Sequence, residues 1–395
     1  MLKILHVVPS YYPAVRYGGP IRSVHGLAAA QVQLGHHVTV FTTNVDGPGV
    51  SDVPVDEPVI KNGVHVHYFP VPWLRRLYWS PAMAKALHVQ MTSADIVHLH
   101  SVFLWPTFAA ARAASAARVP YFLAPRGMLV RQLINAKSRW VKKTWIALVE
   151  RKTMRHAAGL HVTTELEEFD VRALNLPMPP VYCVPNGVEL PDEIVPLSDC
   201  PFTSLPDKYI LYIGRINWKK GLHRLIESLV KIPPEFSLVL AGNDEEGYRA
   251  KLDKLADRLG VKQRIIFLGH VGDRYKWTLY RHARVFVLPS TSENFGNVVI
   301  EAMAMACPVV VTPGVGVADL VHRVQCGTVT DNEPAALARA VCAIGVDEHA
   351  ARTMGRRGEQ AVRETLTWRS VARQMIDAYE EVLSAQDVRL VTQPS

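Results

Sequence analysis

The stretch Val285–Thr312, VFVLPSTSENFGNVVIEAMAMACPVVVT, contains all the parts of one strand–helix–strand unit. Its first segment, Val285–Pro289, is an apolar run with the length of a buried strand. A helix is expected to begin near Asn297, and it must end by Cys307-Pro308 because proline cannot continue a helix. The valines of Pro308–Thr312 then predict a second strand.

The same alternation of strand-like and helix-like segments runs through the whole chain. Further strands are predicted at Leu2–Val8, His37–Thr43, Val64–Phe69, Asp95–His100, Val119–Ala124, Gly159–Thr163, Val181–Val184, Tyr209–Gly214, Ser237–Gly242 and Arg264–Gly269. Strands rich in Val, Ile and Leu and separated by helices are typical of parallel sheets covered on both faces. We therefore predict an α/β protein with two Rossmann-like, doubly wound domains facing across a cleft, and ligands at the carboxyl ends of the strands.

A proline-rich segment without periodicity divides the two halves. Residues 191–207, PDEIVPLSDCPFTSLPD, are interpreted as a linker between an N-terminal domain, 1–190, and a C-terminal domain, 208–367. The final helical stretch, about 368–385, is amphipathic. One stripe of that stretch carries Val371, Met375, Tyr379 and Val382.

Composition places the chain among globular proteins. Its 395 residues, 49% of them hydrophobic, suit two domains. The five cysteines form no CxxC pair and predict buried thiols in a reducing compartment: Cys183, Cys200, Cys307, Cys326 and Cys342. The opening MLKILHVVPS is interrupted by His6 and Pro9, which favours a first strand over a signal peptide. No apolar run approaches the ~20 residues of a membrane-spanning helix. We expect a soluble, cytoplasmic protein.

One segment carries the whole net charge of +8. Arg126–His156 contains nine Lys and Arg residues and a single acid, Glu150. Trp140 and Trp145 lie among these cations, and PWLRRLYWS (72–80) repeats the mixture. A basic helix with interfacial aromatics favours an anionic membrane surface on the inner face of the membrane. The alternative, which the sequence leaves open, is a solvated helix whose Trp residues pack inward. No nucleic-acid motif is present.

The stretch YILYIGRINWKKGL (209–222) places cations directly after a strand. The strand ends at Gly214-Arg215, and Lys219-Lys220 precede the next helix. Arginine offers a planar fork of donors and lysine a compact charge, and both suit phosphate oxygens. Backbone N–H groups at the helix entry would add to them. Without other support, these would be ordinary surface cations.

Two glutamates flank the start of the helix in the opening stretch. Glu301 and Asn297 are four residues apart and share a helix face near its N-terminus, where exposed amides suit a diphosphate. Glu301 could accept hydrogen bonds from vicinal ribose hydroxyls. Glu293, in the preceding loop, could hold a sugar hydroxyl or stabilise positive charge at an anomeric carbon. The structural alternative is a loop charge and an acid favoured by the helix dipole.

Three stretches resemble family 4 of the retaining, nucleotide-sugar-dependent glycosyltransferases. They are GRINWKKG, PNGV (185–188) and ENFGNVVIEAMAMACPVVVT, and Glu293 and Glu301 match the family's E-x7-E motif. The resemblance runs from Ile4 to about Leu383 and implies the GT-B architecture, in which the C-terminal domain holds most of the donor. It also implies that the final helix crosses back to the N-terminal domain.

The resemblance implies a role for each matching residue. Arg215 and Lys220 would bind the donor diphosphate, Glu301 the ribose, and Glu293 the transferred sugar. Further donor contacts are implied at Gly18, Gly19, Gly214, Leu268, Val271, Phe295, Gly296, Asn297 and Val298. His100, at the end of a strand, would face the cleft.

Two positions depart from the family pattern. Ala306 stands where many members have Gly. Arg126-Gly127 replaces His-Gly, as in a subgroup similar to polysaccharide-assembly enzymes, so Arg126 would bind either an acceptor anion or a donor oxygen. His98 and His100 alternate on one strand face, but a third and fourth metal ligand are missing.

The resemblance predicts a retaining hexosyltransferase. With no D-x-D motif, we expect transfer without a metal and without a cofactor, from a UDP or GDP sugar. The expected acceptor is a saccharide, lipid-linked, in bacterial capsule, exopolysaccharide or lipopolysaccharide assembly. The alternatives are a nucleotide-sugar epimerase and a non-catalytic nucleotide-sugar-binding module. PGVGVAD gives only part of a dinucleotide fingerprint, because Asp319 takes the third glycine position.

Overall fold

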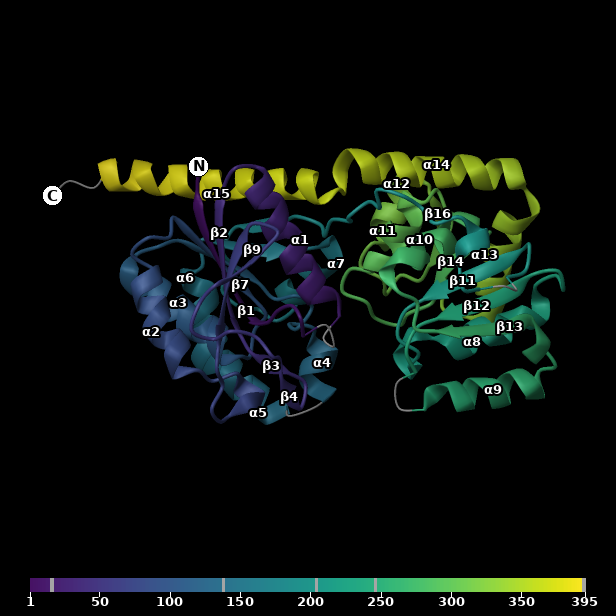
Figure 1. The fold of residues 1–395 in the computed structure, drawn as a ribbon, viewed down its shortest axis with the longest axis horizontal. Helices are drawn as coiled ribbons and strands as arrows, with labels where there is room; N and C mark the ends of the chain where they lie inside the picture. The colour runs from purple at the N-terminus through teal and green to yellow at the C-terminus, as the bar shows by residue number, and fades with distance from the viewer. Residues whose placement is uncertain (15–17, 137–138, 203–204, 245–246, 393–395) are drawn as a thin grey trace. The chain divides into compact units, whose positions relative to one another are not determined.

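The computed structural model describes residues 1–14, 18–136, 139–202, 205–244 and 247–392. Its contacts divide the chain into two compact units (Figure 1). The first unit comprises residues 1–187 together with the chain from Trp368 onward, and the second comprises Val188–Thr367. The terminal helix is therefore part of the first unit.

The first unit is built on an eight-stranded sheet whose described pairings are all parallel except that of β5. In spatial order its strands are β10 (Val181–Cys183), β9 (Gly159–Val162), β8 (Tyr121–Ala124), β7 (Ile96–His100), β1 (Lys3–Ser10), β2 (His37–Thr43), β6 (Val64–Phe69) and β5 (Val59–Lys61). The strand order reverses between β1 and β7. Ligands of open α/β sheets bind at such a switch point, beyond the carboxyl ends of the strands.

Helices cover both faces of this sheet. Alternate residues of β1 point into two different cores, Ile4 and Val8 into one, Leu5 and Val7 into the other. The first core is closed by α1 (Gly19–Gln33) and α15 (Trp368–Thr392). The second core is closed by α2 (Pro81–Gln90), α3 (Trp105–Ala117), α6 (Arg151–His156) and α7 (Glu165–Arg172).

The predicted apolar stripe of α15 is buried in the first core, from Val371 to Val382. At the start of α15, Trp368 packs against two glycines. A Cβ atom on Gly26 would lie 2.2 Å from the indole ring, and one on Gly187 would lie 2.7 Å from it. The glycine of the PNGV stretch therefore makes room for the terminal helix.

The second unit is a six-stranded sheet in which every described pairing is parallel. Its strands, in spatial order, are β13 (Ile265–Gly269), β12 (Ser237–Ala241), β11 (Tyr209–Ile213), β14 (Val285–Leu288), β15 (Val309–Val311) and β16 (Gly327–Val329). The order 3-2-1-4-5-6 is that of a Rossmann fold. The prediction of two Rossmann-like, doubly wound units is confirmed, although the short edge strand β16 was not predicted.

Seven α-helices of the second unit surround this sheet in the described chain. They are α8 (Leu222–Ser228), α9 (Tyr248–Arg258), α10 (Asp273–His282), α11 (Asn297–Ala304), α12 (Ala318–Val324), α13 (Pro334–Val346) and α14 (Glu348–Thr365). The helix predicted in the opening stretch is α11.

The segment 191–207 packs on the second unit within its described part. Val195 and Cys200 are buried, and the Thr278 hydroxyl donates to the Val195 carbonyl at 2.6 Å. All five cysteines are free thiols, but the prediction that all are buried is wrong. Cys183, in the edge strand β10, is exposed, and Cys342 is partly exposed.

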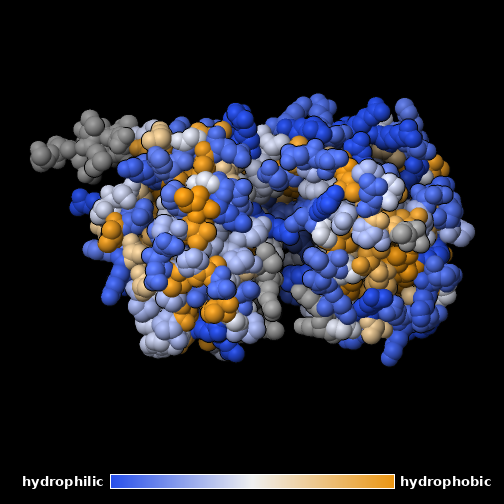
Figure 2. All heavy atoms as spheres, in the orientation of Figure 1, coloured by the Kyte–Doolittle hydropathy of each residue, from blue (hydrophilic) through white to orange (hydrophobic). Residues whose placement is uncertain are grey.

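Apolar residues on the displayed face of each unit form separate patches among hydrophilic ones (Figure 2). Over the described residues, no helix combines the length and the apolar character needed to cross a membrane.

Candidate functional site

The loop that follows β11 is fixed by hydrogen bonds to the neighbouring strand and its loop. The Gly214 amide donates to the Ala241 carbonyl at 2.9 Å, and the Ile216 amide to the Asn243 carbonyl at 2.8 Å. The Tyr212 hydroxyl donates to the Arg215 carbonyl at 2.8 Å. The exposed side chain of Arg215 therefore stands on a rigid loop at the carboxyl end of the central strand.

Lys220 and Glu293 form an ion pair at the carboxyl ends of β11 and β14. Their side chains are 14% and 27% exposed, so ligand can reach both. Lys220 ends the short 3-10 helix η5 (Trp218–Lys220), and Gly221 follows with φ +67°. A Cβ atom on Gly221 would lie 2.1 Å from the Pro289 carbonyl oxygen, so only glycine allows this approach of the two loops.

The Glu293 loop is also held from its other side. The Glu293 amide donates to the Gly314 carbonyl at 2.8 Å, and the Gly316 amide donates to the Glu293 carbonyl at 2.9 Å. A Cβ atom on Gly316 would lie 2.1 Å from the Asn294 carbonyl oxygen. The glycines of PGVGVAD thus support the glutamate loop, which explains the partial fingerprint without a dinucleotide.

The helix α11 begins at Asn297 behind Gly296, whose φ is +101°. Gly296, the N-cap residue, makes no side-chain hydrogen bond to the first turn, which contains Val298 and its backbone N–H group. Phe295 is only 4% exposed and packs in the core, so it can offer a ligand only its backbone. Ala306, after the helix, adopts φ +54°, a conformation that favours glycine.

Glu301 has two partners that the sequence did not suggest. Its carboxylate accepts from Lys276 Nζ at 2.8 Å and from the Tyr280 hydroxyl at 3.0 Å, both on α10. Burial and the Glu301 charge raise the pKa of Tyr280 well above its usual value, so the phenol stays protonated and donates. The only sequence signal was the i, i+4 spacing of Lys276 and Tyr280, which places them on one helix face.

Leu268 lies near the end of β13 and Val271 just after it, along the same edge of the sheet. Both are partly buried and pack against the core. Gly269, between them, accepts from the Gly242 amide at 2.6 Å. The second unit therefore gathers Arg215, the Lys220–Glu293 pair, Glu301 and the end of β13 at one edge.

In the first unit, Gly18 and Gly19 form the start of α1. Gly18 is the N-cap with φ +70°, and residues 15–17 of the same loop lie outside the described residues. His100 ends β7, and Arg126 lies in the loop after β8 with φ +55°. Arg126 Nη2 is 3.3 Å from His100 Nδ1, and its Nη1 donates to Asn186 Oδ1 at 3.1 Å.

Four buried histidines lie behind Arg126: His6, His98, His100 and His161. The prediction that His98 and His100 lack a third candidate ligand is wrong, because ring nitrogens of His6, His98 and His100 lie within 4.8 Å of one another. The alternation of His98 and His100 in the sequence revealed only the two rings of β7, whereas His6 comes from β1 and His161 from β9.

In the basic segment Arg126–His156, one tryptophan points inward and another points outward. Trp145 donates to buried Glu150 at 2.8 Å, whereas Trp140 is 73% exposed beneath the cations of Arg139 and Lys143. Burial raises the pKa of Glu150. Trp140 thus fits the interpretation as a membrane contact, and Trp145 fits the interpretation as a solvated helix with inward tryptophans. Lys137 of this segment lies outside the described residues.

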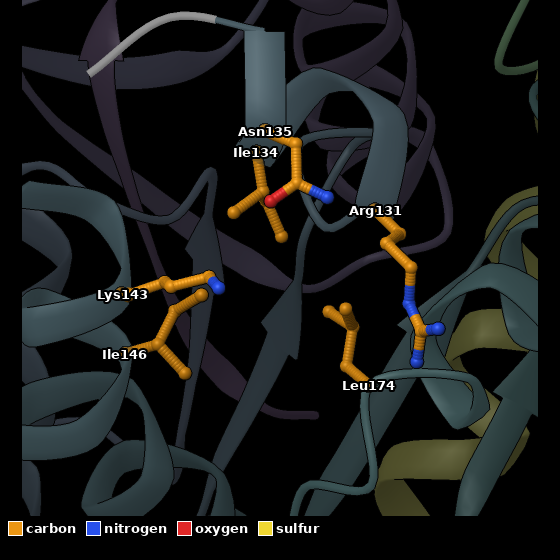
Figure 3. Close-up of a pocket in the computed structure, with 6 residues that line it drawn as sticks. All are labelled: Arg131, Ile134, Asn135, Lys143, Ile146 and Leu174. Atoms are coloured by element: carbon orange, nitrogen blue, oxygen red, sulfur yellow. The ribbon is translucent and has the colours of Figure 1, made fainter. Parts of the chain in front are cut away.

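A cavity of about 360 Å³ is lined mainly by residues of this segment (Figure 3). Figure 3 shows Arg131 and Lys143 on opposite sides of it, with apolar side chains between them. It is lined by residues of α4 (Arg131–Ala136), α5 (Arg139–Trp145), the π-helical segment η3 (Ile146–Glu150) and the turn after α7, namely Arg131, Ile134, Asn135, Lys143, Ile146 and Leu174. Cations beside an apolar floor suit an amphiphile with an anionic group.

Comparison with known proteins identifies the family. Residues 202–361 match the model described as glycosyl transferases group 1, and residues 18–187 match the glycosyl transferase 4-like domain. The chain is a group 1 glycosyltransferase. An uncharacterized glycosyltransferase of Methanocaldococcus jannaschii is 28% identical over 96% of this chain and 98% of its own.

Two further comparisons concern a relative by sequence and a solved structure. The lipopolysaccharide core biosynthesis glycosyltransferase LpsE of Rhizobium meliloti is 32% identical over 45% of this chain and 50% of its own. The structure of Anabaena HepE in complex with UDP superimposes with a TM-score of 0.76 at 20% identity, covering 96% of this chain and all of that one. This likeness confirms the GT-B fold.

Proposed function

We propose that the protein transfers a sugar from a nucleoside-diphosphate sugar, of the UDP type, to a saccharide acceptor with retention of configuration. The observation that carries this proposal is the gathering of Arg215, Lys220, Glu293 and Glu301 at one edge of the second sheet. The complexes of Anabaena HepE with UDP and with UDP-glucose support the choice of donor.

The chemistry follows from the charges. Negative charge develops on the diphosphate as it leaves, and Arg215 and Lys220 stabilise it while the helix α11 offers amides. Glu293 holds the sugar through its hydroxyls, and Glu301 holds the ribose. The departing phosphate accepts the acceptor's proton on the same face of the sugar, which gives retention. The two cations replace the metal ion of D-x-D enzymes in this proposal.

The proposed acceptor is a lipid-linked saccharide of bacterial surface-polysaccharide assembly. The first unit supports this with its exposed basic segment, the outward Trp140 and the cavity between Arg131 and Lys143. LpsE, a relative by sequence, is a lipopolysaccharide core biosynthesis enzyme. Docking of this unit on an anionic membrane surface would bring the acceptor to it.

Nucleotide binding tests the donor site. Isothermal titration of the wild type with UDP, GDP and ADP should show one preferred nucleotide, unaffected by EDTA. Glu301→Gln should weaken that binding roughly 10- to 100-fold, because a hydrogen bond to a charged group is worth about 1.5–3 kcal/mol.

Glu235→Gln is the matched control, because Glu235 is an exposed acid of the same unit and pairs only with Lys208 at 3.9 Å among the described residues. If none of the three nucleotides binds to the folded wild type, the donor site is wrong. Tight UDP binding without any UDP release from UDP-sugars, with or without candidate acceptors, would instead favour the non-catalytic binding module.

Vesicle binding tests the membrane surface. The double variant Trp140→Ser/Leu148→Ser removes two side chains that are 73% and 72% exposed. Binding to phosphatidylglycerol vesicles at low salt should fall roughly tenfold or more, because burying one large apolar side chain is worth about 1.5–3 kcal/mol.

Phe169→Ser is the matched control for that loss. Phe169 is 69% exposed, but it lies on α7, whose first turn carries three glutamates. Equal sedimentation of the wild type and the double variant would exclude the segment as the membrane contact.

A further inference from the structure

The partners of the buried histidines fix the position of every shared proton. Arg126 can only donate, so His100 Nδ1 accepts from it and the His100 proton lies on Nε2. That proton is donated to His6 Nδ1 at 2.9 Å, and His6 Nε2 then donates to Gln31 Oε1 at 2.8 Å. The first chain therefore runs from Arg126 through two rings to Gln31.

A second chain is fixed from its other end. The Val184 carbonyl only accepts, so His161 donates to it from Nε2 at 2.9 Å. His161 Nδ1 accepts from His98 Nε2 at 3.1 Å, and His98 Nδ1 accepts from the Tyr379 hydroxyl at 2.6 Å. Tyr379 belongs to α15, so the terminal helix completes this chain.

All four imidazoles are then neutral, with the proton on Nε2. Burial lowers the pKa of His6 to about 4 and that of His161 to about 3, and it lowers the pKa values of His98 and His100 well below their usual range. Each Nδ1 already accepts a hydrogen bond, and Arg126 adds a positive charge beside the rings. A metal ion bound by these four rings would have to break this network.

The charge of Arg126 has no counter-ion in contact within the part of the chain that the structure describes. Among the described residues, no carboxylate lies within ion-pair distance of its guanidinium. Glu167, whose charge raises the pKa of Arg126, accepts instead from the Gly127 amide at 2.6 Å and the Thr163 amide at 2.8 Å. Arg126 Nε is buried without a partner, and desolvation lowers the arginine pKa to about 10.

The backbone of Arg126 is also held in an unfavourable conformation. A left-handed φ of +55° is strained at a residue other than glycine, and such strain concentrates at functional sites. The residue as a whole remains partly exposed. A strained, poorly compensated cation, oriented by neutral acceptors, is suited to binding an anion.

We propose that Arg126 is an oxyanion-binding residue, oriented by His100 and Asn186, that takes a phosphate or carboxylate group of the substrate. The histidine chain behind it supplies acceptors without supplying negative charge, so the guanidinium keeps its full charge for the ligand. Only the statement that this oxyanion belongs to the substrate rests on the proposed function.

Nitrogen NMR of the full-length protein with ¹⁵N-labelled histidine tests the site. All four buried rings should show the Nε2–H tautomer near neutral pH. Sodium phosphate, titrated against sodium chloride at constant ionic strength, should shift His100 Nδ1 with a dissociation constant in the millimolar range. A parallel titration with sodium acetate distinguishes a phosphate site from a general oxyanion site.

Arg126→Gln should abolish the shift, while Arg112→Gln, which alters an exposed arginine of α3, should keep it. The Tyr379–His98–His161 tautomers report whether the variant is folded. An unmoved His100 in the wild type with both anions, or an equal shift in Arg126→Gln, would overturn the proposal. No nucleotide takes part, so a failure at the Glu301 donor site leaves this result unaffected.

Discussion

Lys220→Ala should lower turnover roughly 100-fold or more, the loss seen when one preorganised oxyanion donor is removed. The Lys220 side chain is 14% exposed and is held by Glu293 on a loop that Gly221 anchors. Its charge stands where the leaving diphosphate becomes more negative, so its loss affects the transition state more than the bound donor. The measurement is the initial rate of UDP release at saturating donor.

Lys219→Ala is the matched control, because Lys219 is the exposed neighbour whose ammonium lies 5.7 Å from the centre of the Trp218 ring. It should keep nearly full turnover. Wild-type turnover in Lys220→Ala, or an equal loss in Lys219→Ala, would contradict the role assigned to Lys220.

The ion pair also predicts coupling between two substitutions. Removing Lys220 leaves Glu293 without its contact partner, so part of the loss arises from an unpaired carboxylate beside an anionic donor. Losses from Lys220→Ala and Glu293→Gln should therefore not add in the double variant. Thermal melts of the three variants separate this effect from unfolding.

The fold could be predicted because its central strands are long and apolar. Strands such as β11 and β14 are almost entirely buried, so their residues form continuous apolar runs. Edge strands carry weaker signals. β5 and β16 have three residues each, all partly or fully exposed. Neither contains an apolar run long enough to distinguish a strand from a loop in the sequence.

The site could be predicted only where its residues are near in sequence. Glu293 and Glu301 belong to one loop and helix, so their spacing identified both. Lys276 and Tyr280 reach Glu301 from α10, and that contact requires the packing of one helix on another. The histidine network likewise requires the sheet order β1, β7, β8 and β9, which local periodicity does not contain.

Lowering the pH should unfold the first unit before the second. The four buried histidines all belong to the first unit, and no histidine of the second unit is buried among its described residues. Each is neutral when folded, with a pKa below the value of 6.5 expected in an unfolded chain. Below pH 6.5 the unfolded chain therefore binds more protons, and the free energy of unfolding falls as the pH falls.

The size of this effect follows from the same shifts. One such histidine lowers the free energy of unfolding by about 1.4 kcal/mol per pH unit. His6 alone, with a folded pKa of about 4, therefore lowers it by roughly 3 kcal/mol between pH 6.5 and 4. With all four histidines, the free energy of unfolding falls roughly four times as steeply with pH. Arg126 beside the rings disfavours their protonation further, whereas the Tyr379 phenol stays neutral. A typical unfolding free energy of about 5–15 kcal/mol would then fall to zero within a few pH units.

Hydrogen exchange of peptides from β7 and β14, measured from neutral pH to about pH 5 and corrected for the intrinsic rate, compares the two units directly. Protection of β7 should fall steeply below pH 6.5, while that of β14 should change little. His6→Gln removes one titrating ring and should lower the slope for β7 by about one proton. The same pH dependence in both strands would mean that general acid unfolding, and not the histidine network, sets the stability of the first unit.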